Sequence, residues 1–255
     1  MNCGAAAGRI DMQEALGNPA ETAVQLTVRD VSRLLDVAES AIIRWIRQRG
    51  LPAHHVGGQY RFNRAELLES ATANRMKVSL EIFDNLESDE EPPPSLSEAL
   101  EAGGIHYRLP DTNKERALRA LVGVLPLPEG VDRELLLRLF LVREASASTA
   151  VGDGIALPHV RNPIVLHVAR PTITLGFLEK PVDFGALDGK PVHVLFSLIC
   201  PTMRSHLQVL ARLSHALHDG RFKEVVLRPG QRDEILGEAR RVEEALGRLG
   251  KAGMP

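Results

Sequence analysis

Apolar residues recur every three or four positions in two short segments near the start of the chain, which predicts two amphipathic helices. The first helix begins at Thr27, where Thr27 and Asp30 have the spacing of a capping box, and it ends near Leu35. The second helix ends at about Arg49, and Gly50 suits the position just after its last turn. Two short helices joined by a tight turn are the arrangement of a helix-turn-helix.

The positions that follow these helices predict a hairpin and a third helix. Two β-prone runs, 53–56 and 60–62, flank a Gly-Gly-Gln sequence, which is typical of a turn between antiparallel strands. Asn63 begins a second capping box and predicts a helix through Glu69. The order of helix, turn, helix, hairpin and helix is that of a small winged helix-turn-helix domain.

The pattern changes in the rest of the chain, where short β-rich runs alternate with helical periods. We expect an α/β domain there, with a mixed sheet flanked by helices. The expected strands are 104–109, 155–157, 172–178 and 193–199, and the expected helices are 111–124, 131–142, 203–218 and 232–249.

An acidic, proline-rich stretch separates the two patterns and predicts a linker, because proline cannot continue a helix and the charged residues cannot form a core. The predicted organisation is a disordered tail at 1–23, a helix-turn-helix domain with a following helix at 24–86, a linker at 87–95 and the α/β domain at 96–249.

Composition limits the cellular location expected for the protein and the kinds of site that it could contain. The 255 residues contain no apolar run near the length of a membrane helix, and the first twenty or so residues lack the apolar stretch of a signal peptide. The two cysteines, Cys3 and Cys200, are far apart and read as free thiols in a reducing compartment. We therefore expect a cytoplasmic protein that neither binds a membrane nor holds a metal ion.

Charge is distributed unevenly along the chain. Segment 24–75 holds eight arginines, no lysine and five acidic residues, although the whole chain has a net charge of −2. An arginine excess on a small helical unit is typical of phosphate binding, and it favours DNA as a partner. The alternative is a docking module whose arginines are only solvated. The residues expected to contact DNA are Ser40, Ile43, Arg44 and Arg47 on the second helix and Arg61 on the wing.

The N-terminal segment resembles the excisionase/MerR-like winged helix-turn-helix family. The runs "LTVRDVSRLLDV", "IIRWIRQRGLPA" and "VGGQYRFNRAEL" carry the resemblance. It implies DNA binding, and we expect a homodimer because such modules usually read paired half-sites.

One histidine stands at the end of a distinctive sequence, "GDGIALPH". A short apolar strand ends there and presents His159 on the following loop, next to the rigid Pro158. A neutral imidazole is a good nucleophile near pH 7. Transfer of a phosphoryl group also needs cations around the equatorial oxygens, and the planar donor fork of Arg143 suits that task.

Residues 96–245 are similar to the enzyme IIA domain of the mannitol/fructose/nitrogen class of the sugar phosphotransferase system. The motifs are "RE…ST…GDGIALPH", "LDGKPVHVLFSLICP" and "SHLQVLARLSHAL". The resemblance implies that His159 carries the phosphoryl group, with Arg143 and His206 as its partners. It also implies a histidine phosphocarrier of the HPr type as donor, and no metal, nucleotide or other cofactor.

Three further side chains are weaker candidates for the same site. The hydroxyl groups of Ser148 and Thr149 could contact the phosphoryl oxygens, or they could only cap a turn. His215 lies nine residues after His206 and is an alternative for its role.

Taken together, the two halves predict a regulatory protein of nitrogen or carbon metabolism. Phosphorylation of His159 by an HPr-type protein would change DNA binding or partner binding, so the chain would be a histidine phosphocarrier rather than a turnover enzyme. One alternative is a relay that passes the phosphoryl group to a sugar transporter. Another is a DNA-binding protein whose C-terminal domain only docks proteins.

Overall fold

The computed structural model describes residues 26–48, 51–74, 76, 78, 94–110, 112–160 and 168–252. The predicted tail, most of the predicted helix after the wing domain, most of the linker and the expected end of the second helix at Arg49 and Gly50 lie outside the described residues. The described residues of that predicted helix, Asn74, Met76 and Val78, are not helical. Within the described ranges, no helix is both long enough and apolar enough to cross a membrane.

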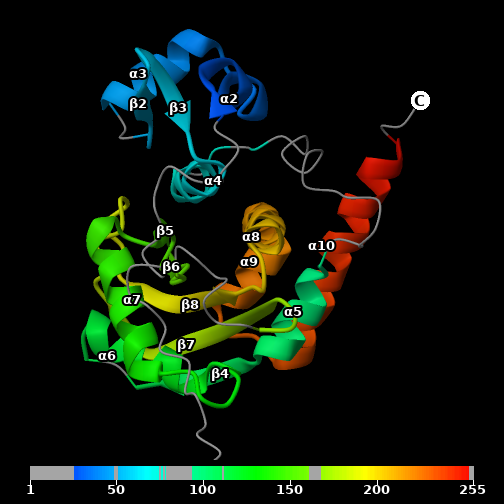
Figure 1. Cartoon of the computed structure of the whole chain (residues 1–255). Helices are drawn as coiled ribbons and strands as arrows, with labels where there is room; N and C mark the ends of the chain where they lie inside the picture. The colour runs from blue at the N-terminus through cyan, green and yellow to red at the C-terminus, as the bar shows by residue number, and fades with distance from the viewer. Residues whose placement is uncertain are drawn as a thin grey trace, which may run out of the picture.

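Three helices form the N-terminal module, as predicted: α2 (Val28–Leu34), α3 (Glu39–Gln48) and α4 (Arg64–Ala73) (Figure 1). The capping box is confirmed, since Thr27 Oγ1 accepts from the backbone N–H of Asp30 at 3.2 Å and Asp30 accepts from the Thr27 N–H at 2.9 Å. Helix α4 continues past the predicted end at Glu69.

A three-stranded sheet with the order β1-β3-β2 completes the module. The predicted hairpin is β2 (His54–Val56) and β3 (Gln59–Phe62), and β1 (Leu26–Thr27) adds to its other edge. Gly57 and Gly58 form the turn with φ angles of 57° and 79°, a combination that glycine adopts without steric strain.

Replacing Thr27 by alanine should destabilise this module by about 1 kcal/mol, because the first turn of α2 loses its side-chain cap. The side-chain hydrogen bond from Thr27 and then its backbone bond lower the pKa of Asp30. That contribution is present above the ordinary carboxyl pKa and is lost as the pH falls through the lowered value, so the variant should also lose part of its acid sensitivity. Urea unfolding at pH 7 and pH 3.5 measures both effects. Thr27→Ser keeps the hydroxyl and should behave as the wild type.

The C-terminal domain is built on a five-stranded mixed sheet, as expected for its α/β class. Its strand order is β4-β7-β8-β6-β5, with parallel pairs β4/β7 and β6/β8 and antiparallel pairs β7/β8 and β5/β6. The strands are β4 (Ile105–Leu109), β5 (Ala150–Gly152), β6 (Ile155–Ala156), β7 (Thr172–Val182) and β8 (Val192–Ile199).

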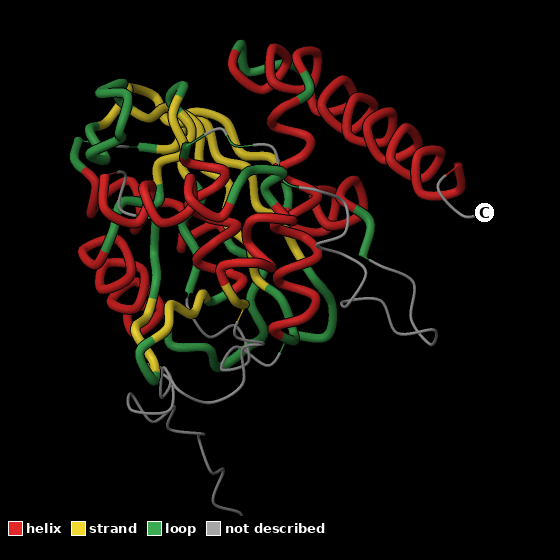
Figure 2. The backbone as a smooth tube through the Cα atoms, turned by 90° about the horizontal axis from the view of Figure 1, so that it is seen from above, coloured by secondary structure: helices red, strands yellow, loops and turns green. Residues whose placement is uncertain are grey.

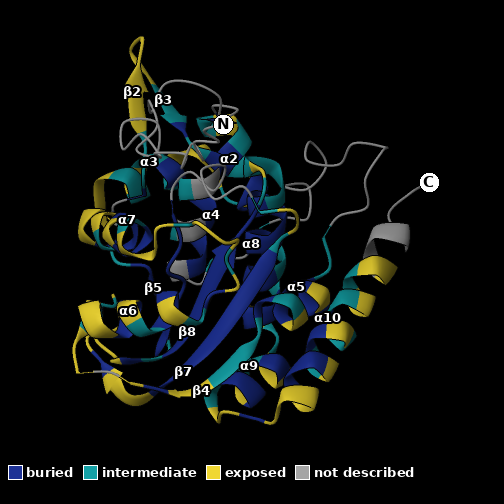
Figure 3. Ribbon diagram, turned by 60° about the horizontal axis from the view of Figure 1, so that its bottom comes forward, coloured by how far each residue is buried: buried dark blue, intermediate teal, exposed yellow. Residues whose placement is uncertain are grey.

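Helices cover both faces of this sheet (Figures 1 and 2). Alternate residues of β8 divide between two buried apolar clusters: Phe196 and Leu198 belong to one, and Leu195 and Ile199 belong to the other. Helices α5 (Leu96–Gly103), α8 (Met203–His218), α9 (Gly220–Leu227) and α10 (Arg232–Ala252) contribute to the first face, and α6 (Lys114–Val124) and α7 (Arg133–Ser146) to the second. Because helices cover both faces, most residues of the central strands β7 and β8 are buried (Figure 3).

The short elements α5, α9 and β5 were not predicted, because none is long enough to show a clear period. Gly103 explains why α5 can lie so close to the sheet. A Cβ atom on Gly103 would lie 2.2 Å from the carbonyl oxygen of Ile173 in β7, so any larger residue would push the helix away.

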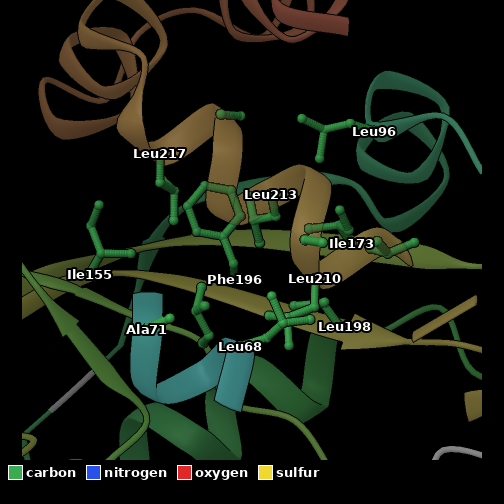
Figure 4. Close-up of a cluster of buried hydrophobic side chains, with 14 of the residues drawn as sticks. Leu68, Ala71, Leu96, Ile155, Ile173, Phe196, Leu198, Leu210, Leu213 and Leu217 are labelled. Atoms are coloured by element: carbon green, nitrogen blue, oxygen red, sulfur yellow. The ribbon is translucent and has the colours of Figure 1, made fainter. Parts of the chain in front are cut away.

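Helix α4 joins the two halves of the molecule. It contacts α8 and β5, and its buried Leu68 and Ala71 belong to the same apolar cluster as Phe196, Leu213 and other residues of the C-terminal domain (Figure 4). The Thr72 hydroxyl donates to the Ser214 hydroxyl across this contact at 2.7 Å, and both residues are buried. The sequence did not predict this contact, since the linker left the placement of the two domains open.

Candidate functional site

His159 lies just after β6, where its backbone forms a parallel bridge to Leu198 of β8. The residue is buried, with 2 % of its surface exposed. Its Nδ1 atom is 2.7 Å from the carbonyl oxygen of Leu157. A carbonyl oxygen can only accept a hydrogen bond, so Nδ1 carries the ring proton and the lone pair of the neutral imidazole is on Nε2. The fold therefore fixes both the orientation and the tautomer of this ring.

The second histidine, His206, lies close to His159 and belongs to a different element, helix α8. It lies in the second turn of α8, after the cap formed by Thr202 and Ser205, and it is also 2 % exposed. The ring centroids of His159 and His206 are 5.2 Å apart, and the ring planes are tilted by 40°. The structure thus brings together the two histidines that the sequence placed 47 positions apart.

His215 does not share this position. Nine residues at 100° each turn its side chain to the opposite side of α8 from His206. Burial, and then the neighbouring charge of His218, lower the pKa of His215, although Asp219 opposes the shift. A half-buried neutral histidine on the far side of the helix fits a structural role.

Arg143 lies in the last turn of α7, where it is largely buried. Its Nη1 atom donates to the carbonyl oxygen of Ala147 at 2.8 Å, which ties the guanidinium to the segment that follows the helix. That segment is hydrogen-bonded to the strand leading to the histidine, because the Leu157 N–H donates to the Thr149 carbonyl at 2.9 Å. Arg143 and His159 are therefore carried by two adjacent, directly bonded segments.

The two candidate hydroxyl groups donate to other protein groups. Ser148 Oγ donates to the carbonyl oxygen of Phe184 at 2.7 Å, and Thr149 Oγ1 donates to the Glu144 carboxylate at 2.5 Å. Either hydroxyl would have to give up that hydrogen bond to donate to a phosphoryl oxygen, so these contacts favour the role of fixing the segment.

Glu144 was missed as a residue of this region, although it is the second residue of the "RE" pair. Its side chain is 3 % exposed and accepts from both the N–H and the hydroxyl of Thr149. The Lys114 ammonium lies 3.1 Å from the same carboxylate and also donates to the Phe184 carbonyl. Lys114 comes from α6, 30 positions earlier, and no local pattern in the sequence links the two residues.

The Lys114→Met variant should be destabilised by about 2 kcal/mol, because the buried Glu144 carboxylate loses its cation. A fully buried pair would cost about 3–5 kcal/mol, and the smaller value allows for the 33 % exposure of the Lys114 side chain. Lys190→Met is the matched control, since its pair with Asp153 is 59 % exposed on the lysine side and should change the unfolding free energy little. Adding Glu144→Gln to Lys114→Met should restore part of the loss; a further loss would contradict this account.

Four of the five DNA-contact candidates share one face of α3, because Ser40, Ile43, Arg44 and Arg47 follow its helical period. Ser40, Arg44 and Arg47 are exposed on α3, whereas Ile42 of the same helix is completely buried. In the described part of the chain no carboxylate pairs with Arg44 or Arg47. Ile43 is partly exposed beside them. Arg61 lies on β3 and donates to the Gln59 side chain at 2.7 Å, which places it on the wing.

The described side chains form neither a group that could hold a metal ion nor a reactive thiol. No group of three or more His, Cys, Asp or Glu residues there could hold a metal ion. Cys200 is buried, and burial raises the pKa of its thiol to about 12, which keeps it protonated and unreactive near neutral pH.

Comparisons with known proteins match each of the two parts of the chain to a described family. Residues 100–237 match the family described as "Phosphoenolpyruvate-dependent sugar phosphotransferase system, EIIA 2", and residues 26–75 match "Helix-turn-helix domain". The nitrogen regulatory protein of Pseudomonas aeruginosa is 33 % identical over 126 residues, which are 48 % of this chain and 79 % of that protein.

Two other relatives differ in how much of their own length is covered by this chain. The fructose-specific EIIABC component of Bacillus subtilis is 30 % identical over 144 residues, which are 55 % of this chain but 22 % of that longer protein. The crystal structure of nitrogen regulatory protein IIA-Ntr from Neisseria meningitidis has a TM-score of 0.50 and 25 % identity, and the match covers 56 % of this chain and 98 % of that one.

Proposed function

Because the chain belongs to the EIIA 2 family of the phosphoenolpyruvate-dependent sugar phosphotransferase system and also carries a helix-turn-helix domain, we propose that it is a phosphorylation-dependent regulator. In this proposal His159 accepts a phosphoryl group from a histidine phosphocarrier protein of the HPr type. The phosphorylation state of His159 then sets the binding of the N-terminal module to DNA or to a partner protein.

The observation that carries the proposal is the hydrogen bond from His159 Nδ1 to the Leu157 carbonyl. It leaves the lone pair on Nε2, which attacks the phosphorus atom. The Nε2–P bond forms while the N–P bond of the donor phosphohistidine breaks, and the donor imidazole leaves with that electron pair. His159 keeps its Nδ1 proton throughout, so the bond to Leu157 also stabilises the positive charge that develops on the ring.

The other site residues stabilise the negative charge on the transferred phosphoryl group. In-line phosphoryl transfer needs positioning and donors to the equatorial oxygens, and the guanidinium of Arg143 supplies donors in a fixed plane. His206, whose ring centroid is 5.2 Å from that of His159, is close enough to donate to a phosphoryl group on Nε2. Both residues act by electrostatic stabilisation, with no covalent step of their own.

Similarity to a nitrogen regulatory protein and the exposed arginines on α3 support the regulatory half of the proposal. The similarity to a fructose-specific component favours a second candidate, a relay that passes the phosphoryl group to a sugar transporter. A pure relay would gain nothing from an arginine-rich DNA-binding surface. Incubating the phosphorylated chain with a membrane enzyme component tests that candidate, because only a relay loses its phosphoryl group to it.

The first test of the proposal is the intact mass of the chain after incubation with phosphoenolpyruvate, enzyme I and HPr. We expect one acid-labile phosphoryl group on the wild type and none on His159→Ala. His55→Ala is the matched control, since His55 is an exposed histidine on the wing and should leave phosphorylation unchanged. Phosphorylation of His159→Ala, or none on the wild type, would rule out His159 as the acceptor.

A further inference from the structure

The contact made by α4 lies on α8, the helix that also carries His206. Thr72 of α4 meets Ser214 of α8, and Ser214 follows His206 by eight residues, which is about 12 Å along the helix. The apolar cluster that includes Leu68 and Ala71 of α4 also contains Leu198, whose backbone bridges to His159 (Figure 4).

A protein donor needs more surface than the histidine itself. His159 and His206 are each 2 % exposed, so the donor must come into close contact with the surrounding surface to bring its phosphorus in line with Nε2. A specific protein interface covers about 800 Å² on each partner, which corresponds to a patch with a radius of roughly 16 Å. The part of α8 that α4 contacts, about 12 Å along the helix from His206, falls within a patch of that radius around the two histidines.

The contact that α4 makes is apolar. Leu68 and Ala71 of α4 share one buried cluster with Ile155, Phe196, Leu198, Leu210, Leu213 and Leu217 (Figure 4). The match to the EIIA 2 family spans residues 100–237 and so does not include α4, which the N-terminal module adds.

We infer that α4 occupies the surface on which the phosphocarrier docks, an inference that rests on the proposed function. The helix-turn-helix module and the carrier then cannot bind to this surface at the same time. The partner that fits this surface is a protein that presents a phosphohistidine surrounded by apolar side chains. Acceptance of the phosphoryl group then requires α4 to leave α8 and β5. The fraction of molecules with α4 released sets the apparent rate of phosphorylation.

The Thr72–Ser214 hydrogen bond gives a way to lock the contact. With hydroxyl oxygens 2.7 Å apart, a Thr72→Cys/Ser214→Cys chain can form a disulfide, whose sulfur atoms are about 2.0 Å apart. A Cys3→Ser background leaves the introduced pair and the buried Cys200 as the only thiols. Rates of phosphorylation by phospho-HPr are measured on the oxidised chain and on the same chain after reduction.

We expect the oxidised chain to be phosphorylated at least 10-fold more slowly than the reduced chain. Equal rates would overturn the inference and leave the proposed function intact, because the reduced chain is still phosphorylated on His159. Absence of phosphorylation on the reduced chain and on the wild type would instead remove the proposed function, and the inference with it.

A single substitution on α4 tests the same contact without a disulfide. Thr72→Arg places a long charged side chain in a buried contact and should raise the rate of phosphorylation several-fold. Thr112→Arg is the matched control, since Thr112 is exposed at the start of α6, on the other face of the sheet, and should leave the rate unchanged. Circular dichroism confirms folding, and a folded variant that is no faster than the wild type would contradict the inference.

Discussion

Phosphoryl transfer to His159 should become about 100- to 1,000-fold slower in the Arg143→Gln variant, the range found when one preorganised donor to a developing charge is removed. Glutamine keeps a side-chain N–H donor, but it has no positive charge for the equatorial oxygens. Rapid-quench measurement of the phosphorylated fraction gives kcat and kcat/KM for phospho-HPr. Both should fall by the same factor, because the interaction is made in the transition state.

Arg143→Lys separates charge from geometry in the same assay. Lysine keeps the charge but loses the planar fork, so we expect an intermediate loss of about 10-fold. The melting temperatures of both variants show whether the segment after α7 has changed. A rate equal to that of the wild type in a folded Arg143→Gln chain would show that the guanidinium does not contact the transferred group.

The second large effect concerns DNA. Replacing Arg44 and Arg47 together by alanine should weaken binding to a random-sequence duplex by about 100-fold at physiological salt. Each arginine that contacts a phosphate releases about one counterion, so the slope of log Kd against log salt should decrease by about 2. Fluorescence anisotropy at several salt concentrations measures both quantities.

Arg108→Ala/Arg248→Ala is the matched control for charge. These side chains are 81 % and 80 % exposed and lie on the C-terminal domain, so their removal lowers the net charge equally without touching α3. If both double variants reduced the salt slope by the same amount, binding would be diffuse and α3 would not be the DNA-contacting element.

Local signals in the sequence were sufficient for most of the elements. The Thr27 capping box, the glycine pair of the wing and the apolar runs of β7 and β8 were all found in the structure. The "GDGIALPH" sequence pointed to His159, whereas His206 was implied by the resemblance to the enzyme IIA domain, and the roles of both stay predictions. Spacing along the chain could not supply their 5.2 Å separation, which depends on how β6, β8 and α8 pack.

What the sequence could not predict depends on contacts between distant segments. Lys114 and Glu144 meet only because α6 and α7 cover the same face of the sheet. The hydroxyl groups of Ser148 and Thr149 looked available, but they are bonded to Phe184 and Glu144. Assigning a hydrogen bond to each side chain needs the folded neighbours, whereas residue type gives only the number of donors and acceptors.

The apolar cluster that α4 shares with the C-terminal domain also affects the stability and the solubility of the N-terminal module when it is separated from the rest of the chain. A unit of that size buries a smaller fraction of its surface than a larger domain does, so it is only marginally stable. Cutting the chain at the acidic stretch would expose Leu68 and Ala71 to water and remove the hydrogen bond between Thr72 and Ser214, which leaves the Thr72 hydroxyl with the Leu68 carbonyl of its own helix. The excised module should therefore be poorly soluble, and the stretch that looks like a domain boundary in the sequence is a poor place to divide the protein for expression.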